Sequence, residues 1–385
     1  MNNFELYNPT RLCFGKGQIE KIASLVPAEA NVMVLIGGGS VKRNGTLDEV
    51  VTALGDRHIS YFEGIEPNPS YETLMQAVAQ VKQQNIDFLL AVGGGSVIDG
   101  TKFVAAAAVF DGEPWDILLQ MGANVHKALP FGAVLTLPAT GSEMNSGSVV
   151  TKKSENAKLF FGSQLVYPQF SILDPTKTYT LPEKQVSNGV VDAFVHTVEQ
   201  YLTYPVNAAV QDRFAEGLLM TLIDQGPLAL KDPENYDVRA NIMFTATMAL
   251  NGLIGVGVPQ DWATHMIGHE LTALHGLDHA QTLAIVLPSV LAEKKVQKLA
   301  KLVQYAERVW GIKEGDDNAK ADAAIQQTRA FFEQMGVKTR LADYGIDDTA
   351  IPALVHQLET HGRLALGEHQ DIDLTTSTRI LRASL

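Results

Sequence analysis

The first half of the chain alternates short apolar runs with glycine turns. Residues 31–39 read NVMVLIGGG, residues 87–100 read DFLLAVGGGSVIDG, and residues 132–137 form a third apolar run that ends at PATGSE. Aliphatic runs that end in glycine are typical of buried parallel strands. Residues 71–84 have helical spacing and follow an NPS sequence suited to a helix cap. This order of strand, glycine turn and helix predicts a parallel α/β sheet with a ligand at the carboxyl ends of its strands.

The pattern changes at residues 174–182, where the prolines of DPTKTYTLP mark a linker. Beyond it, apolar positions recur with the period of a helix. We expect helices over residues 183–201, 206–225, 236–253, 287–310, 318–335 and 347–361. The sequence therefore predicts an α/β, Rossmann-like domain over residues 1–181 and an all-helical domain over residues 182–385.

Composition narrows the kind of protein. The 385 residues are enough for two cores, and 46% apolar with 19% charged residues is typical of a soluble globular protein. A net charge of −13 argues against nucleic acid or an anionic membrane as partner. Cys13 is the only cysteine, which excludes an internal disulfide and a multi-cysteine metal site. Without a signal-like leader or a membrane-length apolar run, the chain is expected to be cytoplasmic.

Three glycine turns are candidates for phosphate binding. Turns without side chains let backbone N–H groups approach a pyrophosphate, and the helix that follows offers its positive end. None matches the G-x-G-x-x-G or Walker pattern, and a turn needed for packing explains any one of them equally well. The three together favour a dinucleotide cofactor. The candidate residues are Gly37, Gly38, Gly39 and Ser40 in the first turn, Gly94, Gly95 and Ser96 in the second, and Thr140 and Ser142 in the third.

The first turn also bears on the choice of cofactor. A carboxylate at this strand end would bind the ribose 2′-hydroxyl and repel a 2′-phosphate. Only glycines and Ser40 stand there, and Lys42 and Arg43 follow closely. This favours NADP(H) over NAD(H), although the two cations could instead simply solvate the start of a helix.

A cluster of histidines marks the second half of the chain. Four of the ten histidines, His265, His269, His275 and His279, fall within fifteen consecutive positions. The first two are four residues apart on one helix face, and Gly276 gives the chain freedom to fold His279 back toward them. The zinc-protease signature H-E-x-x-H is absent. A surface or capping role would explain any single histidine, but four so close together favour a metal site.

Asp192 and His196 are also four residues apart on a predicted helix. Taken alone, they are better explained as a hydrogen-bonded structural pair. Combined with His265 and His279, they make a set of one carboxylate and three imidazoles. Such a set suits Fe(II) or Zn(II), with a coordination position left for a substrate oxygen.

These motifs resemble the iron-containing (group III) alcohol dehydrogenases over essentially the whole chain. The resemblance rests on GGGSVIDGTK at 93–102, LPATGSE at 137–143, NGVVDAFVHTVEQY at 188–201 and THMIGHELTALHGLDHAQTLAIVLP at 264–288. Within the family, residues 235–265 and the GGGSVK turn are similar to the NADPH-dependent aldehyde reductase and butanol dehydrogenase branch.

The resemblance implies a dinucleotide-binding domain, a helical metal-binding domain, a cleft between them and a homodimer. It implies that the metal ligands are Asp192, His196, His265 and His279. It places His269 as a further histidine near the nicotinamide, from which it could deliver a proton. It also implies that Asp99, Thr140 and Lys158 line the cofactor site. The expected reaction is reversible hydride transfer between NADPH and a short-chain aldehyde, mainly in the direction of reduction.

Three other functions stay open at this point. A lyase of the same plan, like dehydroquinate synthase, needs a site rich in Lys and Arg, whereas the helix faces with the predicted ligands are apolar and aromatic. A metal-dependent hydrolase would leave the glycine turns without a role. A nucleotide sensor would bind the cofactor and need no metal.

Overall fold

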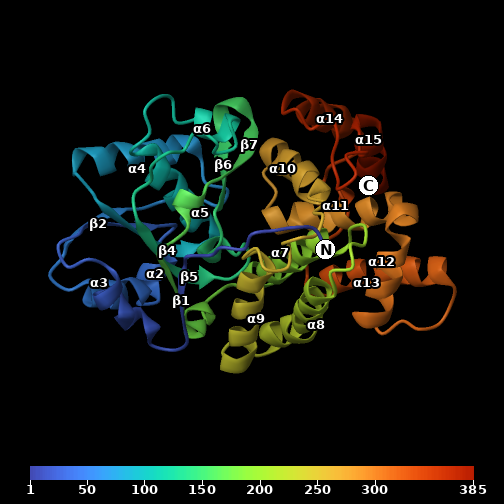
Figure 1. Cartoon of the computed structure of the whole chain (residues 1–385), viewed down its shortest axis with the longest axis horizontal. Coiled ribbons are helices and arrows are strands. Elements are labelled where there is room, and N and C mark those ends of the chain that lie inside the picture. Colours follow the sequence, from blue (N-terminus) through green and yellow to red (C-terminus); the bar gives the residue numbers. More distant parts are fainter. The chain divides into compact units, whose positions relative to one another are not determined.

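The computed structural model describes residues 1–385, which form two compact units. The sheet unit contains Tyr7–Leu181 and Pro233–Thr247. The helical unit contains Met1–Leu6, Pro182–Asp232 and Met248–Leu385. Figure 1 follows the chain through both units in the order of its colours.

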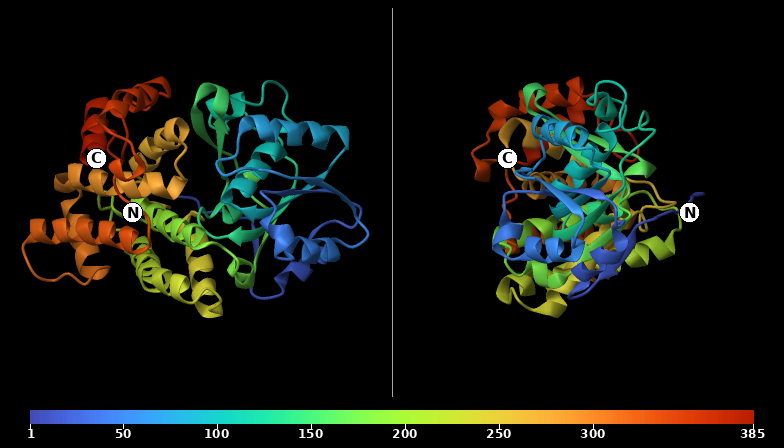
Figure 2. Two further views of the ribbon diagram at one scale, coloured as in Figure 1. Left: turned by 180° about the vertical axis from the view of Figure 1, so that it is seen from behind. Right: turned by 90° about the vertical axis from the view of Figure 1, so that its left-hand side faces the viewer.

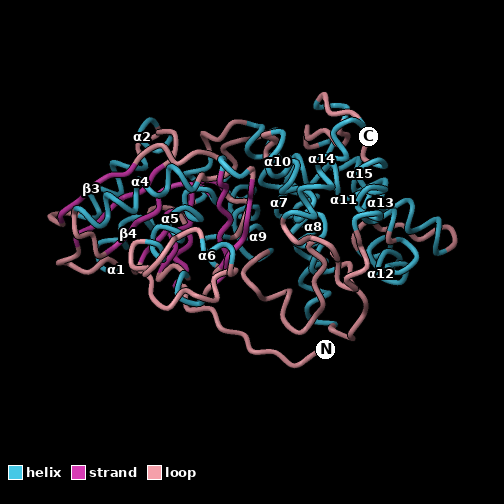
Figure 3. The backbone as a smooth tube through the Cα atoms, turned by 90° about the horizontal axis from the view of Figure 1, so that it is seen from above, coloured by secondary structure: helices cyan, strands magenta, loops and turns pink.

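A six-stranded, fully parallel sheet forms the centre of the sheet unit, with the strand order β1-β8-β5-β4-β2-β3. The strands are β1 (Arg11–Phe14), β2 (Asn31–Ile36), β3 (His58–Phe62), β4 (Phe88–Gly94), β5 (Phe131–Leu137) and β8 (Phe170–Leu173). Two further strands, β6 (Gly147–Lys152) and β7 (Ala157–Gly162), form a separate antiparallel hairpin. Figure 3 shows these strands in magenta. The predicted parallel sheet is confirmed.

Side chains of β2 alternate between two cores, one on each face of the sheet. Val32 and Val34 pack in the core that includes α1 (Ile22–Leu25), α2 (Ser40–Arg43) and α3 (Thr46–Leu54). Met33 and Leu35 pack in the core that includes α4 (Tyr71–Gln83) and α5 (Gly95–Ala107). Figure 2 shows helices on both faces of the sheet. Because both faces are covered, the central strands are continuous apolar runs.

The helical unit contains no strand. Its helices are α7 (Glu183–Tyr201), α8 (Ala209–Lys231), α10 (Ala263–His275), α11 (His279–Glu293), α12 (Lys295–Arg308), α13 (Asp317–Gln334), α14 (Ile351–Thr360) and α15 (Leu374–Ala383). Helices α7 and α11 are buried along most of their length, and they pack against each other. The predicted fold class, an α/β part followed by an all-helical part, is confirmed. No helix combines the length and apolarity needed to span a bilayer.

One predicted helix, over residues 287–310, is wrong. The structure has two helices there: α11 begins at His279 and ends at Glu293, and α12 begins at Lys295. The early start is fixed by capping, since Gln281 Oε1 accepts a hydrogen bond from Asp278 N at 3.0 Å. Pro288 lies inside α11, although a proline is more common in the first turn of a helix.

Two segments belong to the other unit than the one in which a boundary at residue 181 would place them. Residues 233–247, which include most of α9 (Tyr236–Ala249), pack with the sheet unit. There the Phe244 ring contacts Phe14 at a centroid distance of 5.7 Å, and Thr247 Oγ1 donates to Glu143 Oε1 at 2.5 Å. In the helical unit, Asn2 N donates to Gly257 O at 2.9 Å. The division of the chain into one domain over residues 1–181 and a second over residues 182–385 stays a prediction.

Candidate metal centre and cofactor site

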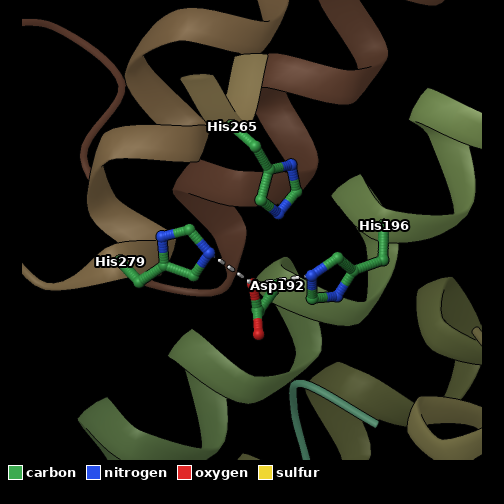
Figure 4. A group of neighbouring side chains, drawn as sticks. All are labelled: Asp192, His196, His265 and His279. Carbon is green, nitrogen blue, oxygen red and sulfur yellow. Dashed lines mark ion pairs between the residues drawn. The ribbon is translucent and has the colours of Figure 1, made fainter. Parts of the chain in front are cut away.

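The structure brings Asp192, His196, His265 and His279 together in the helical unit. One candidate ligand atom from each lies within 4.8 Å of all the others. Helix α7 supplies the first two, α10 supplies His265, and His279 is the first residue of α11. Figure 4 shows the four side chains pointing toward one another from their helices.

Local sequence explains how three helices reach one point. Asp192 and His196 are one turn apart on α7, so they share a face. Helix α10 ends at Gly276, whose φ of 70° is the left-handed conformation usual after a helix. Two residues later Asp278 caps α11, and its Oδ2 accepts from Asn188 Nδ2 of α7 at 3.1 Å. This contact holds the start of α11, and with it His279, against α7.

The distances within the cluster are those of donors around one ion. Asp192 Oδ1 lies 3.8 Å from His196 Nε2 and 3.6 Å from His279 Nε2. The His265 ring stacks on His196 at a centroid distance of 4.7 Å. Donors at about 2.1 Å from one metal ion lie roughly 3 to 4 Å apart. One carboxylate and three imidazoles therefore fit a divalent ion such as Fe(II) or Zn(II).

Burial sets the protonation of the cluster. Asp192, His196 and His265 are buried, whereas His279 is partly exposed. Burial lowers the pKa of His196 to about 4, even though the nearby Asp192 carboxylate opposes the shift. The imidazole of His196 is thus neutral at physiological pH, which is the form that binds a metal.

A fifth side chain, Glu199, reaches the cluster from α7. Its Oε2 contacts Nδ1 of His265, and its Oε1 accepts from the backbone N–H of Thr264 at 2.7 Å. Burial, with the Asp261 carboxylate nearby, raises the pKa of Glu199. The sequence analysis did not single out this residue. The available signal was its position three residues after His196, on the same helix face.

His269 lies beside the cluster without joining the four. Its ring centroid is 5.5 Å from that of His279 and 6.4 Å from that of His265. The side chain is buried on α10, one turn after His265. His269 is thus next to the candidate metal centre, where a group that exchanges protons with a bound substrate is expected.

The candidate cofactor residues gather at one edge of the sheet unit. Strands β2, β4 and β5 are parallel neighbours, so the turns that follow them meet at their carboxyl ends. The helices after β2 and after β4 pack on opposite faces of the sheet. Such a switch point is where open α/β sheets bind their ligands. Helix α5 begins there at Gly95, with its N–H groups at this edge.

The glycines of these turns differ in their surroundings. A Cβ on Gly95 would lie 2.4 Å from Thr140 Oγ1, and one on Gly93 would lie 2.5 Å from Val97 Cγ2. The close packing around these two positions is by itself enough to require glycine there. A Cβ on Gly38 would meet nothing within 4 Å, and Gly38 and Ser40 are exposed. Packing therefore explains the second turn and leaves Gly38 of the first turn unexplained.

Asp99 and Ser142 are joined to each other. Asp99 Oδ1 accepts from Ser142 Oγ at 2.5 Å, and its Oδ2 accepts from Val149 N at 2.9 Å. Burial raises the pKa of Asp99, while the charge of Lys102 opposes that shift. Lys102 was not singled out by the sequence analysis. It is buried, and its Nζ donates to Asn145 Oδ1 at 2.9 Å and to Gly147 O at 2.7 Å.

Lys158 lies on β7, in the hairpin. Its Nζ donates to Asn68 Oδ1 at 2.9 Å, and its charge acts to lower the pKa of Asp99. The predicted cofactor residues therefore come from the turns after three strands, from helix α5, which carries Asp99, and from this hairpin, all within the sheet unit.

Comparison with known families covers nearly the whole chain. The model of the iron-containing alcohol dehydrogenases matches residues 9–175, and the model of the C-terminal region of the same family matches residues 186–385. The chain belongs to the iron-containing alcohol dehydrogenase family.

The chain has full-length relatives within this family. It is 61% identical to the NADPH-dependent aldehyde reductase YqhD of Escherichia coli K12, over 100% of both chains. It is 43% identical to a probable NADH-dependent butanol dehydrogenase of Bacillus subtilis, again over 100% of both. The crystal structure of E. coli YqhD matches 100% of this chain and 99% of its own, with a TM-score of 0.99 and 61% identity.

Proposed function

We propose that this protein is a metal-dependent NADP(H) oxidoreductase that interconverts short-chain aldehydes and primary alcohols, mainly by reducing the aldehyde. The observation that carries the proposal is the convergence of Asp192, His196, His265 and His279 on one point. Its support in sequence is the 61% identity to a relative named as an NADPH-dependent aldehyde reductase. We further propose a cytoplasmic homodimer, with residues 1–181 as the cofactor domain and residues 182–385 as the metal and substrate domain.

The sheet unit would hold the cofactor, which supplies the hydride. The N–H groups at the start of α5 would bind the pyrophosphate, with Gly94, Gly95 and Ser96 at that position. Thr140, Ser142, Asp99 and Lys158 would line the same site, where Asp99 fixes the Ser142 hydroxyl through its hydrogen bond. At the first turn, residues Gly37 to Ser40 would lie beside the adenosine ribose of the cofactor. Lys42 and Arg43 would favour its 2′-phosphate.

The helical unit would hold the metal through the four clustered side chains. A divalent ion bound there would act as a Lewis acid toward the carbonyl oxygen of the aldehyde. The burial of His196 and His265 keeps water from competing for their ring nitrogens. His269, next to His265 and His279, would supply the proton that the product oxygen needs.

The direct test is an absorbance assay of NADPH oxidation. Purified protein loaded with Fe(II) or Zn(II) should oxidise NADPH when butanal or a similar aldehyde is added. Metal-free protein is the control and should be inactive, and NADH should be the poorer cofactor. Metal analysis of protein purified without chelators would identify the ion. Fully metallated protein that shows no aldehyde-dependent oxidation over several chain lengths would contradict the proposal.

A further inference from the structure

Two ligand-bearing helices are joined through one buried carboxylate. Asp192, His196 and Glu199 follow one another on the same face of α7, at spacings of four and three residues. The first two face the candidate metal position. Glu199 instead reaches the beginning of α10, the helix that supplies His265. One helix face thus carries two ligands and the group that contacts a third.

Glu199 makes three separate contacts with the beginning of α10. Its backbone carbonyl accepts from Asp261 N at 2.9 Å, and its Oε1 accepts from Thr264 N at 2.7 Å. Its Oε2 contacts His265 Nδ1. The side chain is buried, so these protein contacts replace the hydration that the carboxylate would otherwise have. Three contacts from one residue thus fix the backbone just before His265 and the imidazole of His265 itself.

The Glu199 contact decides which ring nitrogen of His265 faces the cluster. With Nδ1 directed at the carboxylate, Nε2 is the nitrogen left to face Asp192 and the other ligands, as Figure 4 shows. A neutral imidazole carries one proton, and a carboxylate at Nδ1 holds that proton there. The lone pair of Nε2 is then available to a metal, and the carboxylate makes it more basic.

A second buried network holds the same turn from the other side. Asp261 Oδ1 accepts from Ala263 N at 2.9 Å, and Asp261 Oδ2 pairs with Lys298 Nζ at 2.8 Å. Lys298 is itself buried and also donates to Glu368 Oε1 at 2.6 Å. Trp262, which lies between Asp261 and Ala263, has a φ of 60°, a left-handed conformation that a residue with a large side chain rarely adopts. The surrounding contacts impose this conformation, which supports a turn built to aim His265.

We propose that Glu199 is a positioning residue for the metal, which fixes the ring orientation and tautomer of His265. This inference rests on the proposed metal site and goes beyond it, because Glu199 is not among the four ligands. The competing explanation is that Glu199 only ties α10 to α7. The two differ in what they predict for metal affinity in a variant that still folds.

The chain contains a matched control for this test. Glu270, on α10, is also buried and also contacts the Nδ1 of a histidine, since its Oε1 lies 2.9 Å from His361 Nδ1. His361 is not one of the clustered ligands. Glu199→Gln and Glu270→Gln therefore each replace a buried glutamate that contacts a histidine Nδ1 with its neutral isostere. Only the first glutamate contacts a candidate metal ligand.

The experiment titrates metal-free protein with Zn²⁺, and with Co²⁺ as a spectroscopic probe, against a chromophoric chelator. Glu199→Gln should raise the dissociation constant by about 10- to 100-fold and shift the Co²⁺ absorption bands. Glu270→Gln should leave both unchanged. Thermal melts of the metal-free proteins report the structural cost separately. If Glu199→Gln does not fold, Glu199→Asp is used, because the shorter side chain keeps the charge but cannot reach both Thr264 N and His265 Nδ1. It should also weaken metal binding.

The outcomes separate this inference from the proposed function. Wild-type affinity and spectrum in the folded Glu199 variant would overturn the positioning role and leave the metal site intact. An equal loss of affinity in Glu199→Gln and Glu270→Gln would also overturn it, since a general loss of packing would then be the cause. A wild-type protein that binds neither ion would overturn both proposals.

Discussion

The candidate metal centre and the glycine turns are built in opposite ways. The cluster consists of side chains from three helices, and most of its members are buried. The turns consist of backbone at the ends of three strands, where Gly38 and Ser40 are exposed. In the cluster, chemistry depends on which side chains are present. In the turns, the proposed binding of the cofactor would depend on side chains being absent, so that N–H groups can reach a phosphate.

This difference determines how each region should respond to substitution. Removing a donor from the cluster leaves the other donors too few for the ion, so the loss should be nearly complete. Adding a methyl group to a glycine in a turn alters its packing, or how closely a phosphate can approach its backbone. The resulting loss should be smaller than that from removing a metal donor. The two regions also lie in different units, so damage to one should leave the binding property of the other measurable.

The largest effect is expected for His265→Ala. The variant should lose bound metal, and turnover should fall by about a thousandfold or more, because Lewis-acid stabilisation is worth several kcal/mol. NADPH binding, measured by fluorescence titration, should stay close to that of the wild type. Metal content is measured by elemental analysis. Retention of a full metal equivalent would remove His265 from the ligand set.

His269→Ala is the matched control on the same helix. His269 is buried beside the cluster but is not one of its four members, so this variant should keep its metal. If His269 supplies the proton, turnover should fall by about a hundredfold. An unchanged rate would exclude it from the proton path and would leave the ligand assignment untouched.

The same contrast explains what the sequence could predict. The cluster was recognisable because helical periodicity pairs Asp192 with His196, and because a glycine turn returns His279 to the same place. Helical spacing places Glu199 on the same face as His196, but its contact with His265 could not be predicted, since the two residues are sixty-six positions apart in the chain and meet only in the folded structure. Long-range packing leaves no local periodic signal.

The positions of the glycine turns in the chain could be predicted from the sequence, but the residues that surround them could not. The three apolar runs before them became the neighbouring strands β2, β4 and β5. The short strands β1 and β8, of four residues each, were not predicted, because their pairing depends on partners far away in sequence. Nor does the sequence show that Gly95 packs against Thr140. That contact exists only once β4 and β5 are side by side.

An intermediate effect is expected for Gly95→Ala. Its new Cβ would lie 2.4 Å from Thr140 Oγ1, so the free energy of unfolding should drop by about 1–3 kcal/mol. NADPH affinity should fall as well, whereas metal content should not. Denaturant unfolding and NADPH titration measure the two losses. Gly38→Ala is the control, because its Cβ meets nothing within 4 Å; it should keep wild-type stability and lose only NADPH affinity. Unchanged NADPH affinity in both variants would remove the turns from the cofactor site.

The smallest effect separates the two cations after the first turn. Lys42 Nζ is already paired with Glu63 Oε1 at 2.6 Å, whereas the guanidinium of the exposed Arg43 forms no ion pair. Arg43 Nη1 also lies 3.6 Å from the position of a Cβ on Gly39, so the side chain folds back over the turn. Arg43 is therefore the cation free to bind a 2′-phosphate. Arg43→Ala should raise the KM for NADPH roughly two- to fivefold, the size expected for an exposed charge pair, with the KM for NADH unchanged. Lys42→Ala should have less effect. Equal losses with both cofactors would show that Arg43 does not read the 2′-phosphate.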